Sequence, residues 1–171
     1  MRNAARPKTD RAAAPSPGWV MDGIVTELEV AGGVVVGDDG SACAEVAVRY
    51  AFEEAARRGA PVHVVRSWTI PTGVRPDDVP FGTTPSIVEL QDGTLAETER
   101  RIADLRAELP GVEAHAHAVH GRADHVLVGA ARGADVLVVG SRGRGRVASA
   151  LLGSVATACM RHSTVPVVVV R

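Results

Sequence analysis

Short apolar runs alternate along the chain with longer segments in which apolar and charged positions recur at helical spacing. A short valine- or leucine-rich run fits a strand buried on both faces, whereas an apolar stripe repeating every three or four residues marks one face of a helix. The predicted strands are 34–36, 62–68, 112–119, 136–139 and 165–170. The helices predicted between them are 42–58, 86–109, 122–132 and 150–162.

The first predicted helix illustrates how the pattern assigns faces. An exposed, ion-paired stripe is predicted for four charged residues spaced four apart: Glu45, Arg49, Glu53 and Arg57. The residues predicted to pack inward are Val46, Ala47, Tyr50, Ala51 and Ala55. Ser41 precedes this helix and is predicted to cap its N-terminus. Gly59 follows it and is predicted to end it in a left-handed conformation.

The strict alternation of strand and helix predicts an α/β fold. It implies a parallel sheet with right-handed crossovers and helices on both faces. In such a sheet, ligands bind at the carboxyl ends of the strands, where the strand order reverses. We expect one domain over residues 33–171, preceded by an N-terminal extension over residues 1–32 that is largely disordered.

The extension falls into two parts. Residues 1–17 carry four basic side chains among Ala and Pro and predict a disordered tail, with a nucleic-acid-binding arm as the alternative. Residues 18–32 contain apolar side chains that pack either on the domain or on a partner, and the sequence leaves both open. Residues 69–85 are rich in Pro and Gly and predict a long loop.

Composition narrows the class further. Apolar residues make up 46% of the 171 residues and charged residues 23%, with a net charge of −1, as in a globular domain. This charge argues against a general nucleic-acid or membrane-surface binder. Two cysteines form no disulfide framework, so we expect a cytoplasmic protein with reduced thiols. No apolar run reaches the length that spans a membrane.

Lysine is almost absent. Of the 19 basic residues, all but Lys8 are arginines. A Walker-type phosphate-binding loop needs a lysine beside the β- and γ-phosphates, and Schiff-base catalysis needs a lysine amine. Both chemistries are therefore excluded from residues 33–171.

One loop nevertheless has the chemistry of a phosphate site. It follows the strand 136–139, opens with Gly140-Ser141-Arg142-Gly143, and ends with Gly153-Ser154 at the start of the last helix. Glycines let backbone N–H groups approach an anion closely, and the N-terminus of a helix favours negative charge. Arginine side chains bind phosphate well, so we expect at least one of the loop arginines (Arg142 first, then Arg144 and Arg146) to contact it.

The spacing Gly-x2-Gly-x9-Gly-Ser, between a valine-rich strand and a final Pro-Val-Val-Val-Val strand, resembles that of the universal stress protein family. The resemblance covers about residues 33–171. The segment 35–41 resembles the opening Val-Gly-Val-Asp-Gly-Ser of that family, with Asp38 in place of an apolar residue. It implies a five-stranded parallel sheet of order 3-2-1-4-5, binding of ATP with or without Mg, or of another adenine nucleotide, and a homodimer.

The resemblance also implies roles for single residues. Asp39 would contact the adenosine end, and the backbone around Arg66 and Ser67 would edge the adenine. Gly140 and Gly143 would admit the ribose and phosphates. Backbone groups at the start of the last helix would bind the phosphates. The expected nucleotide-binding residues are Asp39, Ser67, Gly140, Arg142, Gly143, Gly153, Ser154 and Val155.

The remaining reactive side chains have simpler interpretations. His115, His117 and His120 resemble a metal cluster, but no acid or cysteine close in sequence completes one, so we interpret them as a polar strand face and expect no protein metal site. Cys43 and Cys159 fall on predicted helices and are interpreted as inert. No residue is assigned a catalytic role.

The sequence therefore predicts an ATP-binding universal stress protein that acts as a stress-response regulator or sensor, with at most slow ATP hydrolysis. We expect a homodimer through the strand 165–170, because an exposed apolar edge strand invites pairing. One alternative is a homodimeric interaction module that needs no nucleotide. The other is an ATP-cleaving ligase or nucleotidyltransferase of related fold, whose Ser-Gly-Gly-x-Asp-Ser or His-x-Gly-His motif is missing here.

Overall fold

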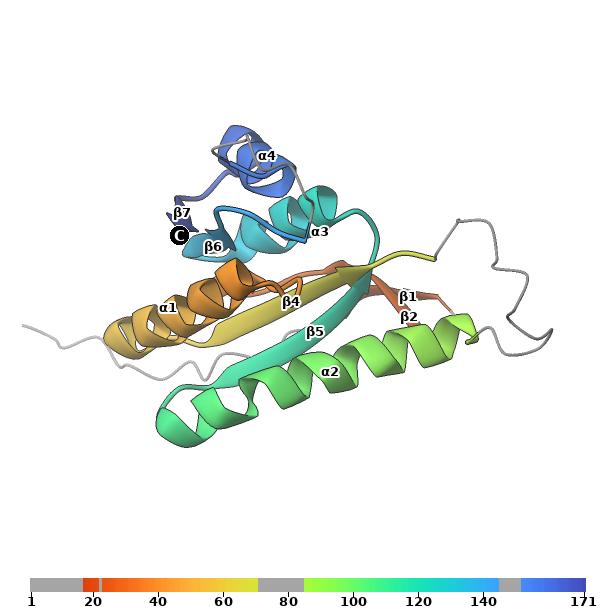
Figure 1. Ribbon diagram of the computed structural model, residues 1–171, viewed down its shortest axis with the longest axis horizontal. Coiled ribbons are helices and arrows are strands. Elements are labelled where there is room, and N and C mark those ends of the chain that lie inside the picture. The colour runs from red at the N-terminus through yellow and green to blue at the C-terminus, as the bar shows by residue number, and fades with distance from the viewer. Residues whose placement is uncertain (1–16, 22, 71–84, 145–151) are drawn as a thin grey trace, which may run out of the picture.

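The computed structural model describes residues 17–21, 23–70, 85–144 and 152–171 (Figure 1). The helices are α1 (Ala42–Arg58), α2 (Ile87–Glu108), α3 (Ala123–Ala130), the 3-10 turn η1 (Ala131–Gly133) and α4 (Ser154–His162). The strands are β1 (Pro17–Met21), β2 (Ile24–Leu28), β3 (Val34–Gly37), β4 (Val62–Trp68), β5 (Ala114–His120), β6 (Val136–Gly140) and β7 (Val167–Val170).

Five strands form one parallel sheet in the order β5-β4-β3-β6-β7. Counted from β3, the first strand of this sheet, the order is 3-2-1-4-5, which confirms the predicted fold class. The chain numbering differs from that count only because β1 and β2 precede the sheet. Val36 of β3 pairs with Val64 of β4 on one side and Val138 of β6 on the other, so valines occupy the centre.

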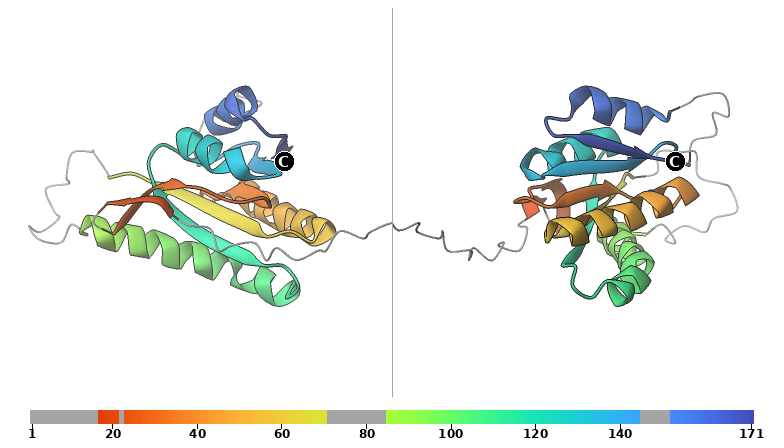
Figure 2. Two further views of the ribbon diagram at one scale, coloured as in Figure 1. Left: turned by 180° about the vertical axis from the view of Figure 1, so that it is seen from behind. Right: turned by 90° about the vertical axis from the view of Figure 1, so that its left-hand side faces the viewer.

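Helices cover both faces of the sheet (Figures 1 and 2). On one face, α1 and α2 bury Phe52 and Ile102 against Val34 and Val36. On the other, α3 and α4 bury Leu127 and Cys159 against Val35 and Leu137. Because both faces are covered, β3 and β6 consist of valine, leucine and a final glycine, whereas β4 also carries His63, Arg66 and Ser67.

The N-terminal strands β1 and β2 form a separate antiparallel pair, in which Val20 pairs with Val25. The sequence analysis did not predict this pair, although Asp22-Gly23 between two apolar segments is a strong hairpin signal. Leu28 and Val30 are buried in the core beside α3. Residues 23–32 therefore pack on the domain, which decides between the two alternatives left open. The predicted disordered tail, residues 1–17, lies outside the described residues except for Pro17, which begins β1. Most of the predicted loop 69–85 also lies outside the described residues.

The predicted ends of α1 are confirmed. The Ser41 hydroxyl accepts a hydrogen bond from the amide of Ala44 at 3.2 Å, and Gly59 adopts a left-handed conformation with φ of 62°. The predicted charged stripe is exposed, but the prediction that its members pair with one another is wrong. Arg49 bonds Glu108 of α2 at 2.7 Å, and Arg57 bonds Glu54 at 2.6 Å. Val46, predicted to pack inward, is 48% exposed, because α2 and the sheet cover the opposite side of α1.

Three predicted boundaries move by a few residues. The last helix begins at Ser154 rather than at residue 150, and residues 145–151 lie outside the described chain. β5 begins at Ala114 rather than at 112, and β7 at Val167 rather than at 165. Pro166 precedes β7 and has no N–H to donate, but its carbonyl accepts a bond from the Leu137 amide at 3.0 Å.

Candidate nucleotide site

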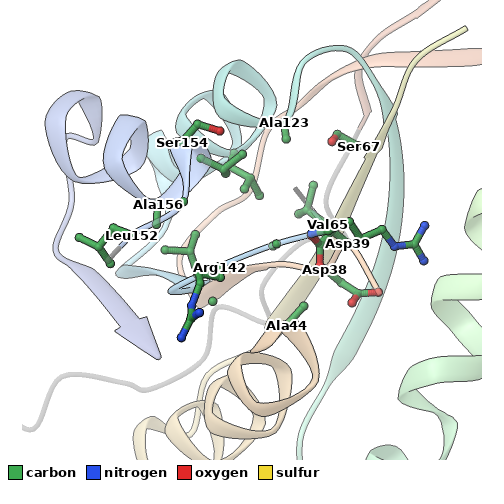
Figure 3. A pocket seen from close by; sticks show the side chains of 18 residues that line it. Asp38, Asp39, Ala44, Val65, Ser67, Ala123, Arg142, Leu152, Ser154 and Ala156 are labelled. Carbon is green, nitrogen blue, oxygen red and sulfur yellow. The ribbon is translucent and has the colours of Figure 1, made fainter. Parts of the chain in front are cut away.

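A cavity of about 580 Å³ opens at the carboxyl ends of β3, β4 and β6, beside α3 and α4 (Figure 3). The strand order reverses between β3 and β6, so this is the place where parallel sheets bind ligands. Its lining contains every residue predicted for the nucleotide: Asp39, Ser67, Gly140, Arg142, Gly143, Gly153, Ser154 and Val155. The fold thus brings together residues from four separate segments of the chain.

Asp39 joins the two loops that flank the cavity. Its Oδ1 accepts the amide of Ser41 at 2.9 Å, and its Oδ2 accepts the amide of Arg144 at 2.9 Å. Burial raises the pKa of Asp39, but the hydrogen bonds donated by Ser41 and Arg144 outweigh it, so the pKa lies below its ordinary value. The carboxylate is therefore ionised at neutral pH.

The loop glycines are required for different reasons. A Cβ on Gly140 would lie 3.0 Å from the carbonyl carbon and oxygen of Cys43, so α1 itself crowds this position. A Cβ on Gly143 would collide with the carboxylate of Asp39. At Gly153 the nearest atom would be the Cα of Arg142 at 3.5 Å, an ordinary contact. Only Gly153 therefore leaves room that a larger side chain would take from a ligand.

The N-terminus of α4 supplies the backbone donors. The amide of Gly153, a predicted phosphate donor, is already bonded to the carbonyl of Ser141 at 2.8 Å. Ser154, Val155 and Ala156 form the first turn, where N–H groups have no partner within the helix, and no side chain of the described residues caps this end. These three amides, rather than that of Gly153, are therefore the donors available to an anion.

The rest of the lining is mostly apolar. Val65 and Val139 come from the strands, and Ala123 and Leu127 lie one turn apart on α3. These α3 residues were not predicted, although a spacing of four places them on one helical face. Figure 3 shows the guanidinium of Arg142 directed away from Ser154 and Ser67, so this arginine borders the cavity without pointing into its centre.

Asp38, the departure from the family pattern, is buried. Its Oδ2 lies 3.0 Å from Nε of Arg101 and 3.5 Å from a guanidinium nitrogen of Arg66, and its Oδ1 accepts the amide of Gly40 at 3.0 Å. Arg66 also bonds Glu97 of α2 at 2.9 Å. The charge of Asp38 is therefore balanced on the α2 side of the sheet, rather than left free beside a ligand.

The histidines of β5 lie beside a histidine of β4. Among the residues that the structure describes, no group of three His, Cys, Asp or Glu has a geometry that would hold a metal ion. His63 of β4 instead joins His115 and His117: its Nδ1 lies 3.2 Å from Nε2 of His117, and its ring stacks on that of His115 at 5.1 Å. The sequence analysis missed His63 because only the strand register places it there.

The two cysteines are free thiols. Burial raises the pKa of Cys159 to about 11, so this thiol stays protonated at neutral pH. This agrees with the inert role predicted for it, because the thiolate is the reactive form.

The parallel sheet, with a cavity at its switch point and a helix N-terminus on the cavity wall, defines an α/β protein with a candidate small-ligand site at its carboxyl edge. A family model described as the universal stress protein family matches residues 33–171, and the chain belongs to that family.

Relatives support the same family. A universal stress protein of Mycolicibacterium smegmatis is 36% identical over 138 residues, and one of Mycobacterium tuberculosis is 37% identical over 138 residues. Each alignment covers 81% of this chain but 45% of the relative. The chain therefore spans less than half the length of the curated relatives it matches.

Solved structures share the fold. The universal stress protein UspA from Lactobacillus plantarum superposes with a TM-score of 0.66 at 18% identity, covering 84% of this chain and 99% of that one. A universal stress protein in complex with cAMP has a TM-score of 0.60 at 26% identity, covering 82% and 96%. One from Archaeoglobus fulgidus in complex with dAMP has a TM-score of 0.52 at 28% identity, covering 81% and 97%.

Within the described part of the chain, no helix has both the length and the apolar character needed to cross a membrane.

Proposed function

We propose that this chain binds an adenine nucleotide, ATP in the first place, in the cavity at the carboxyl edge of the sheet, and that it acts as a regulator or sensor in a stress response. The observation that carries the proposal is the convergence of all eight predicted residues on one cavity. Two family members of similar fold are described as complexes with cAMP and dAMP, which supports an adenine nucleotide as the class of ligand.

The residues present fit such a ligand. The apolar side chains of Val65, Leu127 and Val139 suit a base, and a cavity of about 580 Å³ lies within the range of small-ligand sites. The free amides of Ser154 and Val155 suit phosphate oxygens. No lysine is needed, in agreement with the composition. Mg²⁺, where it accompanies ATP, would be held by the phosphates.

The same residues favour binding over turnover. The two acids at the end of β3 are the nearest candidates for a general base, and both are engaged: Asp38 by arginines, Asp39 by backbone amides. The hydrogen bonds to Asp39 also lower its pKa, which makes it a weak base. We therefore expect ATP hydrolysis to be slow at most, with the ligand shifting a population of conformations or partners.

We also propose a homodimer through β7. This strand forms one edge of the sheet, and its four valines are only half-buried. An apolar edge strand is stabilised when a second copy covers it. The alignment with this chain covers 45% of each matched relative, so each relative has room for a second segment of this size. In a homodimer, a second copy of this chain would take the place of that segment.

The cytoplasmic location predicted from the cysteine content is part of the proposal and is supported by the two free thiols. Fractionation of the native host is its test, and recovery of the protein outside the cytoplasm would contradict it.

Native mass spectrometry of protein purified without added ligand, followed by calorimetry with ATP, AMP, cAMP and GTP, tests the binding proposal. We expect adenine nucleotides to bind and to raise the melting temperature, because a ligand that binds only the folded state stabilises it. GTP serves as the matched control for the base. A dimer of unchanged melting temperature in all four nucleotides would favour the nucleotide-independent interaction module instead.

A further inference from the structure

Asp38 borders the ligand cavity, yet its side chain is only 1% exposed. A buried carboxylate is costly unless it is paired and hydrogen-bonded. Here the pairing is extensive, and it reaches away from the cavity, to the helix α2 on the opposite side of the sheet. Asp38 therefore connects the wall of the cavity to α2.

Four charged side chains form the cluster, two acids and two arginines: Asp38, Arg66, Glu97 and Arg101. Asp38 lies at the end of β3, and Arg66 lies on β4 directly before the cavity residue Ser67. Glu97 and Arg101 lie one turn apart on α2. The formal charges cancel, so the cluster bridges three elements without a surplus of charge.

The carboxylate of Asp38 is bonded in two directions. Its Oδ1 accepts the amide of Gly40 at 3.0 Å and so shapes the turn between β3 and α1, in which Gly40 is left-handed with φ of 76°. Its Oδ2 accepts Nε of Arg101 at 3.0 Å. One side chain thus joins α2 to the turn that carries Asp39, the residue that bonds both loops of the cavity.

We propose that Asp38 is a positioning residue of the ligand site and that it couples α2 to the β3–α1 turn. The apolar residue of the family pattern would satisfy burial but would leave the turn and α2 unconnected. Through Asp38, a displacement of α2 alters the placement of Asp39, and by reciprocity a ligand in the cavity alters α2. The ligand half of this inference rests on the proposed function; the coupling of α2 to the turn does not.

The test removes the contact from its distant end. Arg101→Gln loses the bond to Asp38, but Arg101 does not itself line the cavity. Its side chain is 28% exposed, so the fold is expected to survive. Arg100→Gln is the matched control, because Arg100 is an exposed neighbour on the same helix that, among the described residues, bonds only the carbonyl of Ala96. Arg101→Lys keeps the charge and one donor.

Two readouts are measured: ATP affinity by calorimetry, and the backbone amide resonances of Asp39, Gly40 and Ser41 without ligand. We expect Arg101→Gln to weaken ATP binding about five- to tenfold and to shift all three resonances, because hydrogen bonds to charged groups are strong. Arg100→Gln should leave both readouts as in the wild type, and Arg101→Lys should recover part of the affinity.

Asp38→Asn supplies a second variant. Gly40 and Arg101 bond different oxygens of the carboxylate, and the asparagine amide keeps an oxygen at only one of these two positions and carries no charge. It should therefore weaken ATP binding at least as much as Arg101→Gln. The proposal is overturned if Arg101→Gln matches Arg100→Gln in the resonances of the turn. If the wild type binds no adenine nucleotide, the proposed function fails, and those resonances alone still decide the coupling.

Discussion

Asp39 and Arg144 lie 105 positions apart in the chain, and the amide of Arg144 donates a hydrogen bond of 2.9 Å to Oδ2 of Asp39. This bond holds the glycine-rich loop after β6 against the turn after β3. Since both segments line the cavity, the bond determines how far apart its two walls stand. Asp39, which is expected to contact the adenosine, therefore also holds together the two loops that line the cavity.

Asp39→Ala removes both amide contacts of this carboxylate. We expect the free energy of unfolding to fall by about 3 kcal/mol, because two hydrogen bonds to a charged group are lost, each at the lower end of about 1.5–3 kcal/mol since Asp39 is only half-buried. ATP affinity should fall at least tenfold, because the loop is no longer held in place. Urea unfolding and calorimetry measure the two effects. Unchanged affinity would mean that Asp39 neither touches the ligand nor orders the loop.

Glycine substitutions should separate packing from binding. Gly153→Ala places its Cβ at an ordinary 3.5 Å, so the melting temperature should hardly change. Gly153→Val fills the space between the loop and the first turn of α4 and should abolish the ATP-dependent rise in melting temperature while the fold persists.

Gly140→Ala is the counterpart, with its Cβ 3.0 Å from the carbonyl of Cys43. It should destabilise the ligand-free protein by about 1–3 kcal/mol, as overpacked positions do. Thermal melts with and without ATP distinguish the two positions. Equal loss of stability in both alanine variants would contradict the assignment of Gly153 to the ligand.

The histidine cluster predicts a pH dependence of stability. Burial lowers the pKa of His63 to about 4, and burial together with His63 and His115 lowers that of His117 to about 3. The unfolded chain, in which both pKa values lie near the ordinary 6.5, binds these protons first, so stability is greatest above pH 6.5 and declines as the pH falls toward 4. Each histidine contributes a slope of up to about 1.4 kcal/mol per pH unit.

Urea unfolding over about three pH units, from about pH 4.5 to about pH 7.5, measures this decline in stability. His63→Gln removes the ring whose Nε2 is buried without a partner, among the described residues, and should flatten the slope relative to the wild type. His162→Gln, at the exposed end of α4, is the control and should not. An identical slope in wild type and His63→Gln would show that the cluster is not the titrating group.

The edge strand predicts the oligomeric state. Light scattering should give twice the chain mass of 17.8 kDa at micromolar concentration, because pairing of β7 covers its half-buried valines. On dilution, the mass should fall toward that of one chain at concentrations below the dissociation constant of the dimer. A mass of one chain at every concentration, up to the solubility limit, would remove the dimer from the proposed function.

Much of the fold could be predicted from the sequence because its signals are local. The valine runs specify buried strands, Ser41 and Gly59 mark the ends of α1, and alternation of strand and helix leaves few topologies. The strand order itself came from the family resemblance, and the hairpin of β1 and β2 was missed although its turn residues were in view.

The residues that line the candidate site could be predicted from the sequence in the same way. Its loops follow β3 and β6, and carboxyl ends of parallel strands meet at one edge, so residues from distant segments could be grouped before any coordinates. The sequence could not predict which backbone amides at the start of α4 are already hydrogen-bonded and which are available to a ligand. That Gly153 donates to Ser141, while the next three amides have no partner among the described residues, depends on the tertiary placement of Ser141 against α4.

By itself, the sequence determined the parallel α/β class, the family, the absence of a lysine from the cavity and the loops that form it. Only the tertiary structure decided the partners of the charges and imidazoles. Arg101 reaches Asp38 across 63 positions, and His63 meets His117 across 54, because α2 crosses the sheet at one place and β4 pairs with β5 in one register. Such contacts depend on the relative placement of whole elements, which no local pattern of side chains encodes.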